Sequence, residues 1–506
     1  MRQKQLRRST DGLRTTSRLG LATGIPAITV ASERQGEEAI LITQERADFI
    51  NEQEIEGILT PRRRPASAMV HELLAKAREM RGLSMEEVAC LSYVEQPELV
   101  AQILAAAKKI KEEIYGTRLV LFAPLYISNR CMNECTYCAF RATNTSLKRR
   151  TLDQEEIAEE TRTLIRQGHK RVLMVSGEAL PPEGFQYLLD SIATIYSTRV
   201  GPGEIRRVNV NLAPQTTERF RLLKQAEIGT FQLFQETYHR PTYAAVHLKG
   251  TKRDYDWRAT AFDRAMEAGI DDVGLGVLFG LYDWRFEIMA MMQQIRHLEE
   301  SFGVGPHTIS FPRMEPAVGS DVASQPPHPV SDADFMKMIA IMRLAVPYTG
   351  MIMSTRETAE VRRATLELGI SQISAGSRTD PGGYKDGEGD PNGSQFQLGD
   401  HRSVEEVVSD VVSLGFLPSF CTACYRLGRT GQDFMDMAKP GEIKYHCHPN
   451  ALSTFQEYLS DYAGAEAKTQ GEKLISIELQ QMDGRQTACA LPMLNKVRRG
   501  ERDVFV

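Results

Sequence analysis

The feature that most constrains the fold is a regular alternation of strand-like and helix-like segments between residues 117 and 378. The first strand-like run, LVLFAPLYIS, is apolar and rich in β-forming residues, and each run is followed by a stretch with a helical pattern. Eight such runs occur, at 119–128, 170–178, 205–213, 229–238, 271–280, 307–313, 349–355 and 370–376. Alternation on this scale favours parallel βαβ units. We therefore expect an α/β fold in which the eight strands close into a (β/α)8 TIM-type barrel.

The segments outside this alternation differ from it in pattern. Residues 46–116 carry helical spacing, whereas a connection rich in Gly, Asp and Pro follows Arg378. The last forty or so residues are charged, and we expect them to be partly mobile. The chain divides into four expected parts: a flexible basic tail or transit-like extension at 1–45, an N-terminal helical region at 46–116, the barrel at 117–378, and a C-terminal domain at 379–506.

Two helix starts are indicated by residues spaced as capping boxes. Thr151 with Gln154 predicts one before the first barrel helix, and Ser403 with Glu406 predicts another after the connection. In such a box each residue's side chain hydrogen-bonds the other residue's backbone N–H, so both pairs predict where a loop ends.

The composition argues against several classes of function. The formal charge is −5 at pH 7, which gives no support to nucleic-acid binding through overall charge. No apolar run reaches the roughly 18 residues of a membrane span. Six of the eight cysteines fall in two tight groups, which indicates metal sites in a reducing compartment. We therefore expect no nucleic acid and no membrane among the partners.

The start of the sequence leaves two interpretations of the compartment open. The segment MRQKQLRRSTDGLRTTSRLGLATG is rich in Lys and Arg, and Asp11 is its sole acid. The apolar core of a secretory signal does not follow it. The segment is either a basic tail on a cytoplasmic bacterial protein, or a transit peptide for an organelle such as a plastid, hydrogenosome or mitochondrion.

The first cysteine group lies directly after the first strand-like run. The segment SNRCMNECTYCAFR places Cys131, Cys135 and Cys138 at the spacing C-x3-C-x2-C. Three thiolates can hold an iron–sulfur cluster, but a closed four-iron cluster takes four. The missing ligand leaves one iron free for a substrate. A structural zinc ion would take four protein ligands, and no other Cys or His is close enough in the sequence to complete that set.

This motif, with Tyr137 before its last cysteine, resembles that of the radical S-adenosylmethionine (SAM) superfamily. The resemblance implies that the open iron binds S-adenosyl-L-methionine, which is split by reduction to give a 5′-deoxyadenosyl radical. Gly177 and Glu178 end the second strand-like run and resemble the pair that contacts the methionine amine. Gly276 and Gly280 end the fifth run and resemble the segment that passes the adenine.

The second cysteine group again contains three thiols. Cys421 and Cys424 are spaced C-x2-C, and Cys447 follows after a longer gap. One interpretation is a zinc site completed by His446 or His448. The other is a second iron–sulfur cluster, which with three ligands would also leave one iron free.

A more specific resemblance joins the two groups. The segments CTACYRLGRTG, GEIRRVNVN (203–211), FQETYH (234–239) and GVLFGLYDW (276–284) are similar to those of the HydG family of FeFe-hydrogenase maturases, over about residues 46–465. The resemblance implies that the Cα–Cβ bond of L-tyrosine is cleaved to p-cresol and a dehydroglycine fragment. It also implies that a second cluster converts this fragment to CO and cyanide on iron. The implied cofactors are two 4Fe-4S clusters, SAM and an additional iron, and the implied partners are a one-electron reductant protein and other hydrogenase maturation proteins.

The resemblance also directs attention to single residues. A histidine holds the additional iron in this family, and His307, at the start of the sixth run, is the main candidate, with His297 as the alternative. Arg313, Ser374 and Arg378 lie near strand ends and are candidates for binding the tyrosine substrate.

Two other functions are compatible with parts of this pattern. The tyrosine lyase of thiazole biosynthesis, 2-iminoacetate synthase, shares the barrel and releases dehydroglycine, but it has one cluster. A non-catalytic iron–sulfur scaffold protein would have little need for so long an α/β architecture. The second cysteine group therefore favours the maturase.

Overall fold

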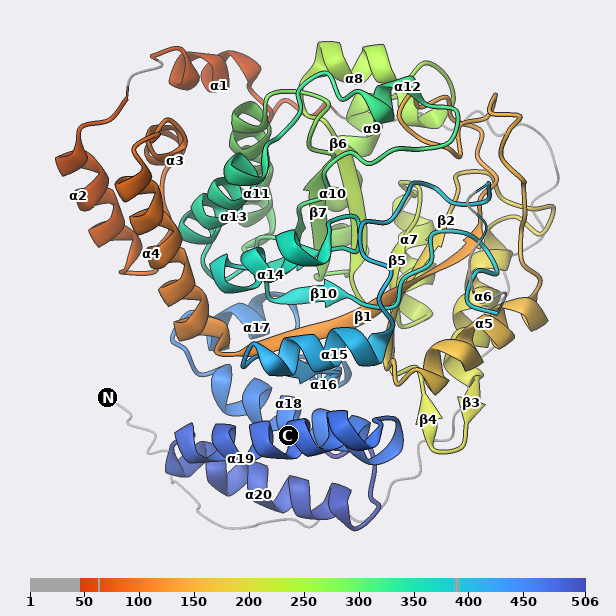
Figure 1. Cartoon of the computed structure of the whole chain (residues 1–506). Helices are drawn as coiled ribbons and strands as arrows, with labels where there is room; N and C mark the ends of the chain where they lie inside the picture. Colours follow the sequence, from red (N-terminus) through yellow and green to blue (C-terminus); the bar gives the residue numbers. More distant parts are fainter. Residues whose placement is uncertain (1–45, 62–63, 386, 388–389, 391) are drawn as a thin grey trace, which may run out of the picture.

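The computed structural model describes residues 46–61, 64–385, 387, 390 and 392–506, so the basic tail expected at 1–45 lies outside the described residues. A closed barrel of eight parallel strands forms its centre (Figure 1). The strands are β1 (Arg118–Ser128), β2 (Arg171–Ser176), β5 (Arg207–Asn211), β6 (Phe231–Glu236), β7 (Val273–Val277), β8 (Thr308–Ser310), β9 (Gly350–Met353) and β10 (Gln372–Ser374). Pairing of β10 with β1 closes the ring. The predicted barrel and its eight strands are confirmed.

Helices cover the outside of the barrel and extend it at both ends. Before β1 come α1 (Glu52–Leu59), α2 (Ser67–Ala77), α3 (Met85–Ser92) and α4 (Pro97–Tyr115). The segments between barrel strands hold α5 (Gln154–Arg166), α6 (Phe185–Ser197), a hairpin of β3 (Arg199–Val200) and β4 (Gly203–Glu204), α7 (Thr217–Gln225), α8 (Arg240–Val246), the 3-10 helix η1 (Thr251–Arg253), α9 (Tyr255–Ala259), α10 (Ala261–Glu267), α11 (Trp284–Phe302), α12 (Asp321–Ser324), α13 (Asp332–Ala345) and α14 (Ala359–Leu368). No helix in these described ranges has the length and apolarity needed to span a membrane.

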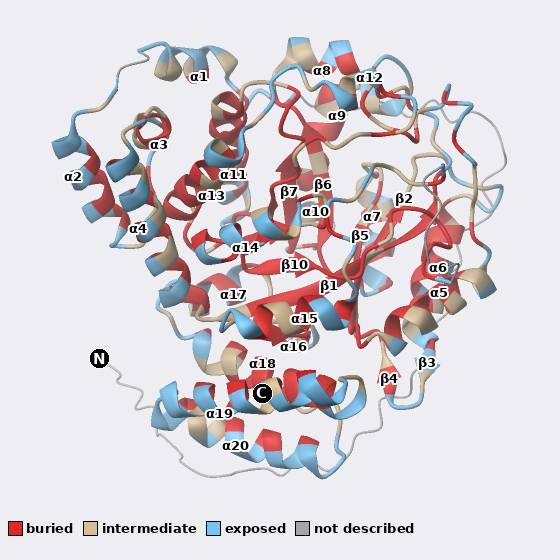
Figure 2. Ribbon diagram, viewed as in Figure 1, coloured by how far each residue is buried: buried red, intermediate tan, exposed pale blue. Residues whose placement is uncertain are grey.

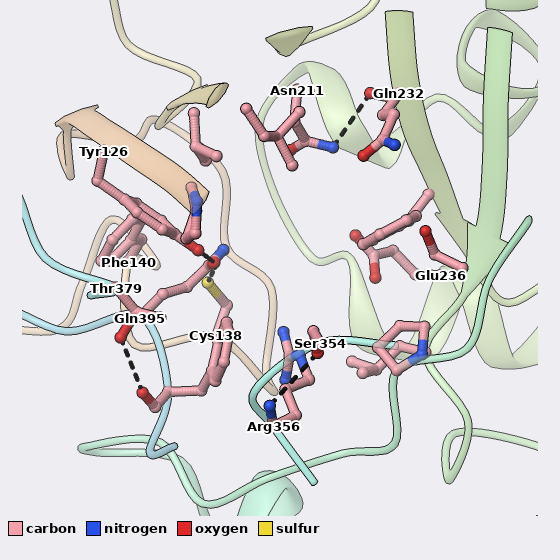
Figure 3. A pocket seen from close by; sticks show the side chains of 18 of the residues that line it. Tyr126, Cys138, Phe140, Asn211, Gln232, Glu236, Ser354, Arg356, Thr379 and Gln395 are labelled. Atoms are coloured by element: carbon pink, nitrogen blue, oxygen red, sulfur yellow. Dashed lines mark hydrogen bonds between the residues drawn. The ribbon is translucent and has the colours of Figure 1, made fainter. Parts of the chain in front are cut away.

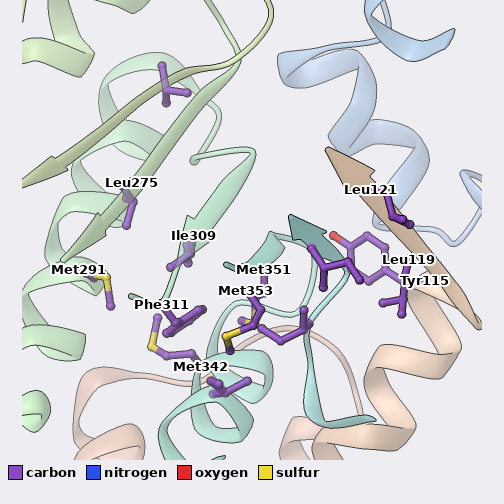
Figure 4. Packing of buried hydrophobic residues seen from close by; sticks show 14 of the residues in the cluster. Tyr115, Leu119, Leu121, Leu275, Met291, Ile309, Phe311, Met342, Met351 and Met353 are labelled. Carbon is purple, nitrogen blue, oxygen red and sulfur yellow. The ribbon is translucent and has the colours of Figure 1, made fainter. Parts of the chain in front are cut away.

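The side chains of the barrel strands alternate between two environments. Outward-facing residues such as Leu275, Ile309 and Met351 are buried against α11 and α13 (Figures 2 and 4). The residues next to them in the strands face the interior, and they include small or polar residues such as Ser310 as well as the apolar Ile352. The apolar layer between strands and helices thus stabilises the barrel, while the interior leaves room for cavities.

The C-terminal part is attached to the barrel through a ninth strand that the sequence did not indicate. It comprises α15 (Val404–Ser413), β11 (Leu417–Ser419), α16 (Ala423–Arg426), α17 (Gly431–Ala438), α18 (Lys444–Asp461), α19 (Ala465–Gln481) and α20 (Gly484–Arg498). Strand β11 pairs in parallel with the first residues of β1, with Arg118 opposite Leu417. The chain that follows β11 therefore lies at the end of the barrel where the strands begin.

One predicted helix start is confirmed and the other is wrong. Ser403 and Glu406 form the capping box of α15. At α5 the box is formed by Asp153 and Glu156 rather than by Thr151 and Gln154. Asp153 is as good an N-cap as a threonine and is also followed three residues later by a glutamate, so two overlapping signals competed.

The expectation that the last residues are partly mobile is wrong. Helices α19 and α20 pack against α18, and buried Leu474, Ile475 and Leu494 belong to the main core. An ion-pair network also ties α18 to the barrel, because Arg206 lies 2.7 Å from Glu457. Burial alone would raise the pKa of Glu457, but the Arg206 guanidinium holds it at about 2.

Candidate active site

A cavity of about 1460 Å³, part of it open to solvent, lies where the barrel strands end (Figure 3). The loop after β1 brings the thiols of Cys131, Cys135 and Cys138 into its wall. Tyr137 lines the same wall, and its hydroxyl lies 2.8 Å from Nε2 of the buried His247. This contact holds the cysteine loop against α8.

The state of these thiols shows what they can bind. Burial raises the pKa of all three, to about 11 for Cys138, so the thiolates need a nearby cation. In the part of the chain that is described, no three His, Cys, Asp or Glu side chains are grouped closely enough to hold a single metal ion. Three thiols brought into one cavity wall match the three-cysteine ligand set of an iron–sulfur cluster.

Gly177 and Glu178 lie beside the cysteine loop and line the cavity. A Cβ atom on Gly177 would lie 2.2 Å from the carbonyl oxygen of Arg130, so only glycine allows this approach of the two loops. The Glu178 carboxylate accepts hydrogen bonds from Asn133, at 2.6 Å, and from Arg258, at 3.1 Å. Burial would raise the pKa of Glu178, but Arg258 and other neighbours lower it overall.

An ion pair in the same cavity wall as Glu178, formed by Lys252 and Glu236, was not singled out from the sequence. Lys252 Nζ lies 2.6 Å from Glu236 Oε1, and both residues line the cavity. Glu236 has a φ of 72°, which is unusual for a residue other than glycine and places its side chain at the end of β6. The motif FQETYH contains Glu236, so the sequence held a signal for its position, although not for its partner.

Gly276 and Gly280 do not line the cavity, but Leu278, which lies between them, does. A Cβ atom on Gly276 would be 2.8 Å from the Phe234 ring, and Gly280 has a φ of 117°. The segment between these glycines therefore reaches the cavity through Leu278, and the glycines allow the path of its backbone.

The three candidates for substrate binding are placed differently. Ser374 lines the cavity. Arg313 is paired instead with Glu357 and Asp332, and Arg378 donates hydrogen bonds to the carbonyl oxygens of Ser377 and Gly387. Neither arginine is part of the cavity wall.

Arg356 lines the cavity instead, together with Cys138 and Glu236 (Figure 3). Its guanidinium lies 3.3 Å from the centre of the Phe396 ring, and within the described residues no group accepts a hydrogen bond from it. Glu315 is a second cavity residue without a hydrogen-bond partner in the described chain. Burial and the nearby Glu357 raise its pKa to about 7.

The connection after Arg378, which the sequence marked only as a loop, closes one side of this cavity. Gln395 accepts a hydrogen bond from Tyr126 at 2.8 Å, and its amide nitrogen lies 3.8 Å from Cys138 Sγ (Figure 3). Thr379 and Phe396 also line the wall. No residue pattern in this segment predicted that role.

A second cavity, of about 590 Å³ and also partly open to solvent, lies at the opposite end of the barrel. Cys421 follows β11, Cys424 lies on α16 and Cys447 on α18, and all three thiols line this cavity. His307 lines it as well, because it directly precedes β8 at the end where strands begin. The structure thus brings together these four residues, which are far apart in sequence.

The second cavity is rich in positive charge. Arg118, Arg171 and Arg429 line it, and Arg171 donates a hydrogen bond to the carbonyl oxygen of Cys421. A hydrogen bond from Cys424, together with Arg118 and Arg429, lowers the pKa of Cys447. An anionic group such as a thiolate-bound cluster is therefore favoured here.

The other histidines considered for metal binding are engaged elsewhere. His446 lies 2.9 Å from the Arg429 guanidinium, and His448 lies 2.7 Å from the Glu478 carboxylate. His297 contacts Asp263 and stacks on Phe49. Of the histidines considered, His307 is the one in the cavity wall.

Comparison with known proteins agrees with this arrangement. The sequence model of the radical SAM superfamily matches residues 125–294, and that of the biotin and thiamin synthesis associated domain matches residues 310–417. A crystal structure of HydG, a maturase of the [FeFe]-hydrogenase, has 47% sequence identity and a TM-score of 0.87; the match covers 91% of this chain and 100% of that one. The chain belongs to the HydG family.

Two further proteins are similar to this HydG-family chain, a second HydG and a 2-iminoacetate synthase. The FeFe-hydrogenase maturase HydG from Carboxydothermus hydrogenoformans has 39% identity and a TM-score of 0.78, covering 88% of this chain and 97% of its own. A 2-iminoacetate synthase from Escherichia coli (strain K12) is 32% identical over 332 residues, which is 65% of this chain and 85% of that protein. The chain is therefore an enzyme, a radical SAM lyase that uses a 4Fe-4S cluster and SAM.

Proposed function

We propose that this HydG-family chain cleaves the Cα–Cβ bond of L-tyrosine in the larger cavity and forms CO and cyanide on iron in the smaller one. The observation that carries this proposal is the presence of two three-thiol sites at opposite ends of one barrel. Neighbouring layers of the same strands line both cavities: Ser374 lines the larger and Gln372 the smaller, and Ile352 and Gly350 do the same on β9. The two cavities therefore share the interior of one barrel.

The proposed roles in the larger cavity follow from its lining. Cys131, Cys135 and Cys138 would hold the first cluster, which with SAM supplies an organic radical. Glu178 is suited to accept a hydrogen bond from the SAM amine. Apolar residues of the wall, such as Phe140, Leu278 and Met314, would limit the access of water to reactive species.

We assign the tyrosine main chain to Arg356 and Glu315. A free guanidinium suits a carboxylate, with which it can form two parallel hydrogen bonds. A carboxyl group suits the ammonium, whose positive charge would lower the pKa of Glu315 from about 7 and favour its anion. Together the two side chains match the zwitterion of an α-amino acid, and Ser374 lines the same cavity as a neutral residue.

Arg356→Ala is expected to raise the KM for tyrosine about 10- to 100-fold, because a hydrogen bond to a charged group contributes about 1.5–3 kcal/mol. Arg356→Lys should recover part of this loss. Arg378→Ala is the matched control, because the hydrogen bonds of that side chain go to main-chain oxygens and it lies outside the cavity wall in the described structure. The measurement is p-cresol formation against tyrosine concentration. An unchanged KM in Arg356→Ala would remove Arg356 from the substrate site.

The smaller cavity is the proposed site of the second 4Fe-4S cluster. Cys421, Cys424 and Cys447 would be its ligands, and His307 would hold the additional iron that becomes part of the product. CO and cyanide bind low-spin iron strongly, so such a site should offer an open iron. The proposed recipients of the product are other hydrogenase maturation proteins, and a one-electron reductant protein would supply the electrons.

The alternative activity is that of a 2-iminoacetate synthase, which would release dehydroglycine without forming CO. The similarity to HydG structures extends over more of the chain and is higher in identity. The organised second thiol site also supports the maturase. Assay of CO beside p-cresol distinguishes the two activities.

A further inference from the structure

Three exposed apolar side chains lie on the loop that carries the first cysteine group or on connections that contact this loop. Met132 is 50% exposed, Leu180 is 40% exposed and Leu248 is 54% exposed. They belong to three separate connections, after β1, after β2 and after α8. Large apolar side chains grouped around a functional loop are typical of interaction surfaces.

Hydrogen bonds join these connections into one surface. The Leu248 N–H donates to the Glu134 carbonyl oxygen, and the Glu134 N–H donates to that of Lys249, each at 2.9 Å. Gly177 and Arg130 are in close backbone contact, as described above. Contacts between backbone groups therefore hold this surface in place, so it does not have to rearrange when a partner binds.

The charges on this surface are mainly positive. Arg130, Lys249 and Arg253 are exposed, and none of them forms an ion pair within the described chain. Among the acids of the same connections, Glu134 is paired with Arg141 and Glu178 with Arg258, Asp254 is half-buried, and Glu183 is exposed. The chain as a whole carries a formal charge of −5, so the positive charge is a local feature.

We propose that this surface is the docking site of a small, acidic iron–sulfur electron carrier, a proposal that rests on the proposed function. We name the surface the cysteine-loop rim. It consists of Arg130, Met132, Leu180, Leu248, Lys249 and Arg253.

The location fits electron delivery, because Met132 is adjacent to Cys131 in the chain. One electron would leave the reduced carrier, which is oxidised, and enter the cluster at Cys131, Cys135 and Cys138, which is reduced. No bond is made and no proton is transferred in this step. Transient redox interfaces are small, and complementary charge mainly increases the rate of encounter. A few exposed apolar side chains together with unpaired cations on the same connections match such an interface.

The test compares a protein donor with a chemical one in the full-length, cluster-loaded enzyme. The variants are Leu248→Ser and the double variant Lys249→Glu with Arg253→Glu. SAM cleavage is driven either by a reduced, acidic two-cluster ferredoxin or by dithionite. We expect the KM for ferredoxin to rise at least about 10-fold at low salt in the double variant, while the dithionite-driven rate stays unchanged. Added salt should narrow the difference between wild type and variant.

Met69→Ser on α2 and Lys109→Glu on α4 are matched controls, because both residues are exposed and belong to the N-terminal helices on the other side of the barrel (Figure 1). An unchanged ferredoxin KM in the rim variants would overturn the proposal. Equal losses with both donors would also overturn it, because docking affects only the protein donor. Binding of ferredoxin, measured by calorimetry, does not require turnover, so docking and the proposed tyrosine chemistry can fail separately.

Discussion

Cys135→Ser is expected to abolish SAM cleavage, p-cresol formation and CO formation together. Cys135 is buried in the wall of the larger cavity, where a serine hydroxyl would stay protonated and could not replace a thiolate ligand. The rate of 5′-deoxyadenosine formation should fall by at least about 10³-fold, and reconstituted iron should fall from about eight or nine per chain by about four.

Cys90→Ser and Cys489→Ser are the matched controls for this prediction. Both cysteines lie outside the two groups and line neither cavity. They should keep the full iron content and all three products. Retention of SAM cleavage in Cys135→Ser, measured by quantifying 5′-deoxyadenosine, would contradict the assignment of the first cluster.

Replacing Cys421 and Cys424 together by serine is expected to separate the two reactions. The smaller cavity loses two of its three thiols, while the larger cavity at the other end of the barrel is untouched. SAM cleavage and p-cresol should persist within about 3-fold of wild type, whereas CO and cyanide should fall below detection. The measurement is p-cresol by chromatography and CO by its complex with ferrous haemoglobin.

The contrasting outcome is an equal loss of p-cresol and CO in this double variant. That result would mean that the second thiol site is needed for tyrosine cleavage or for folding. A circular dichroism spectrum and the iron content distinguish these two causes, because a folded chain with about four irons still holds the first cluster.

The barrel could be predicted from the sequence because its strands are covered by helices and read as apolar runs. The location of His307 at the second cavity could also be predicted from the expected barrel. A residue at the start of a strand lies at the end of the barrel away from the first thiol group, which follows the end of β1. Strand β11 could not be predicted, because it is only Leu417–Ser419 and contains Pro418. It exists through its pairing with β1, which is a tertiary contact.

The candidate substrate-binding residues show what could not be predicted from the sequence. Arg313, Arg356 and Arg378 all lie near strand ends, and the sequence alone does not tell them apart. Arg313 forms ion pairs with Glu357 and Asp332, and Arg378 donates hydrogen bonds to main-chain oxygens. Of these three arginines, Arg356 is therefore the one that lines the cavity. Which arginine stays free depends on partners that come from other parts of the fold. The ordered C-terminal helices were missed for the same reason, because their charge is on the surface and their apolar face packs on α18.

The central claim is that one chain cleaves tyrosine and turns the remaining fragment into CO. Its most direct test is a single anaerobic reaction of the cluster-loaded protein with SAM, dithionite, L-tyrosine and ferrous haemoglobin. The account predicts p-cresol together with the absorption band of carbonyl-haemoglobin. p-Cresol without that band would contradict the claim and indicate a lyase of the 2-iminoacetate synthase type.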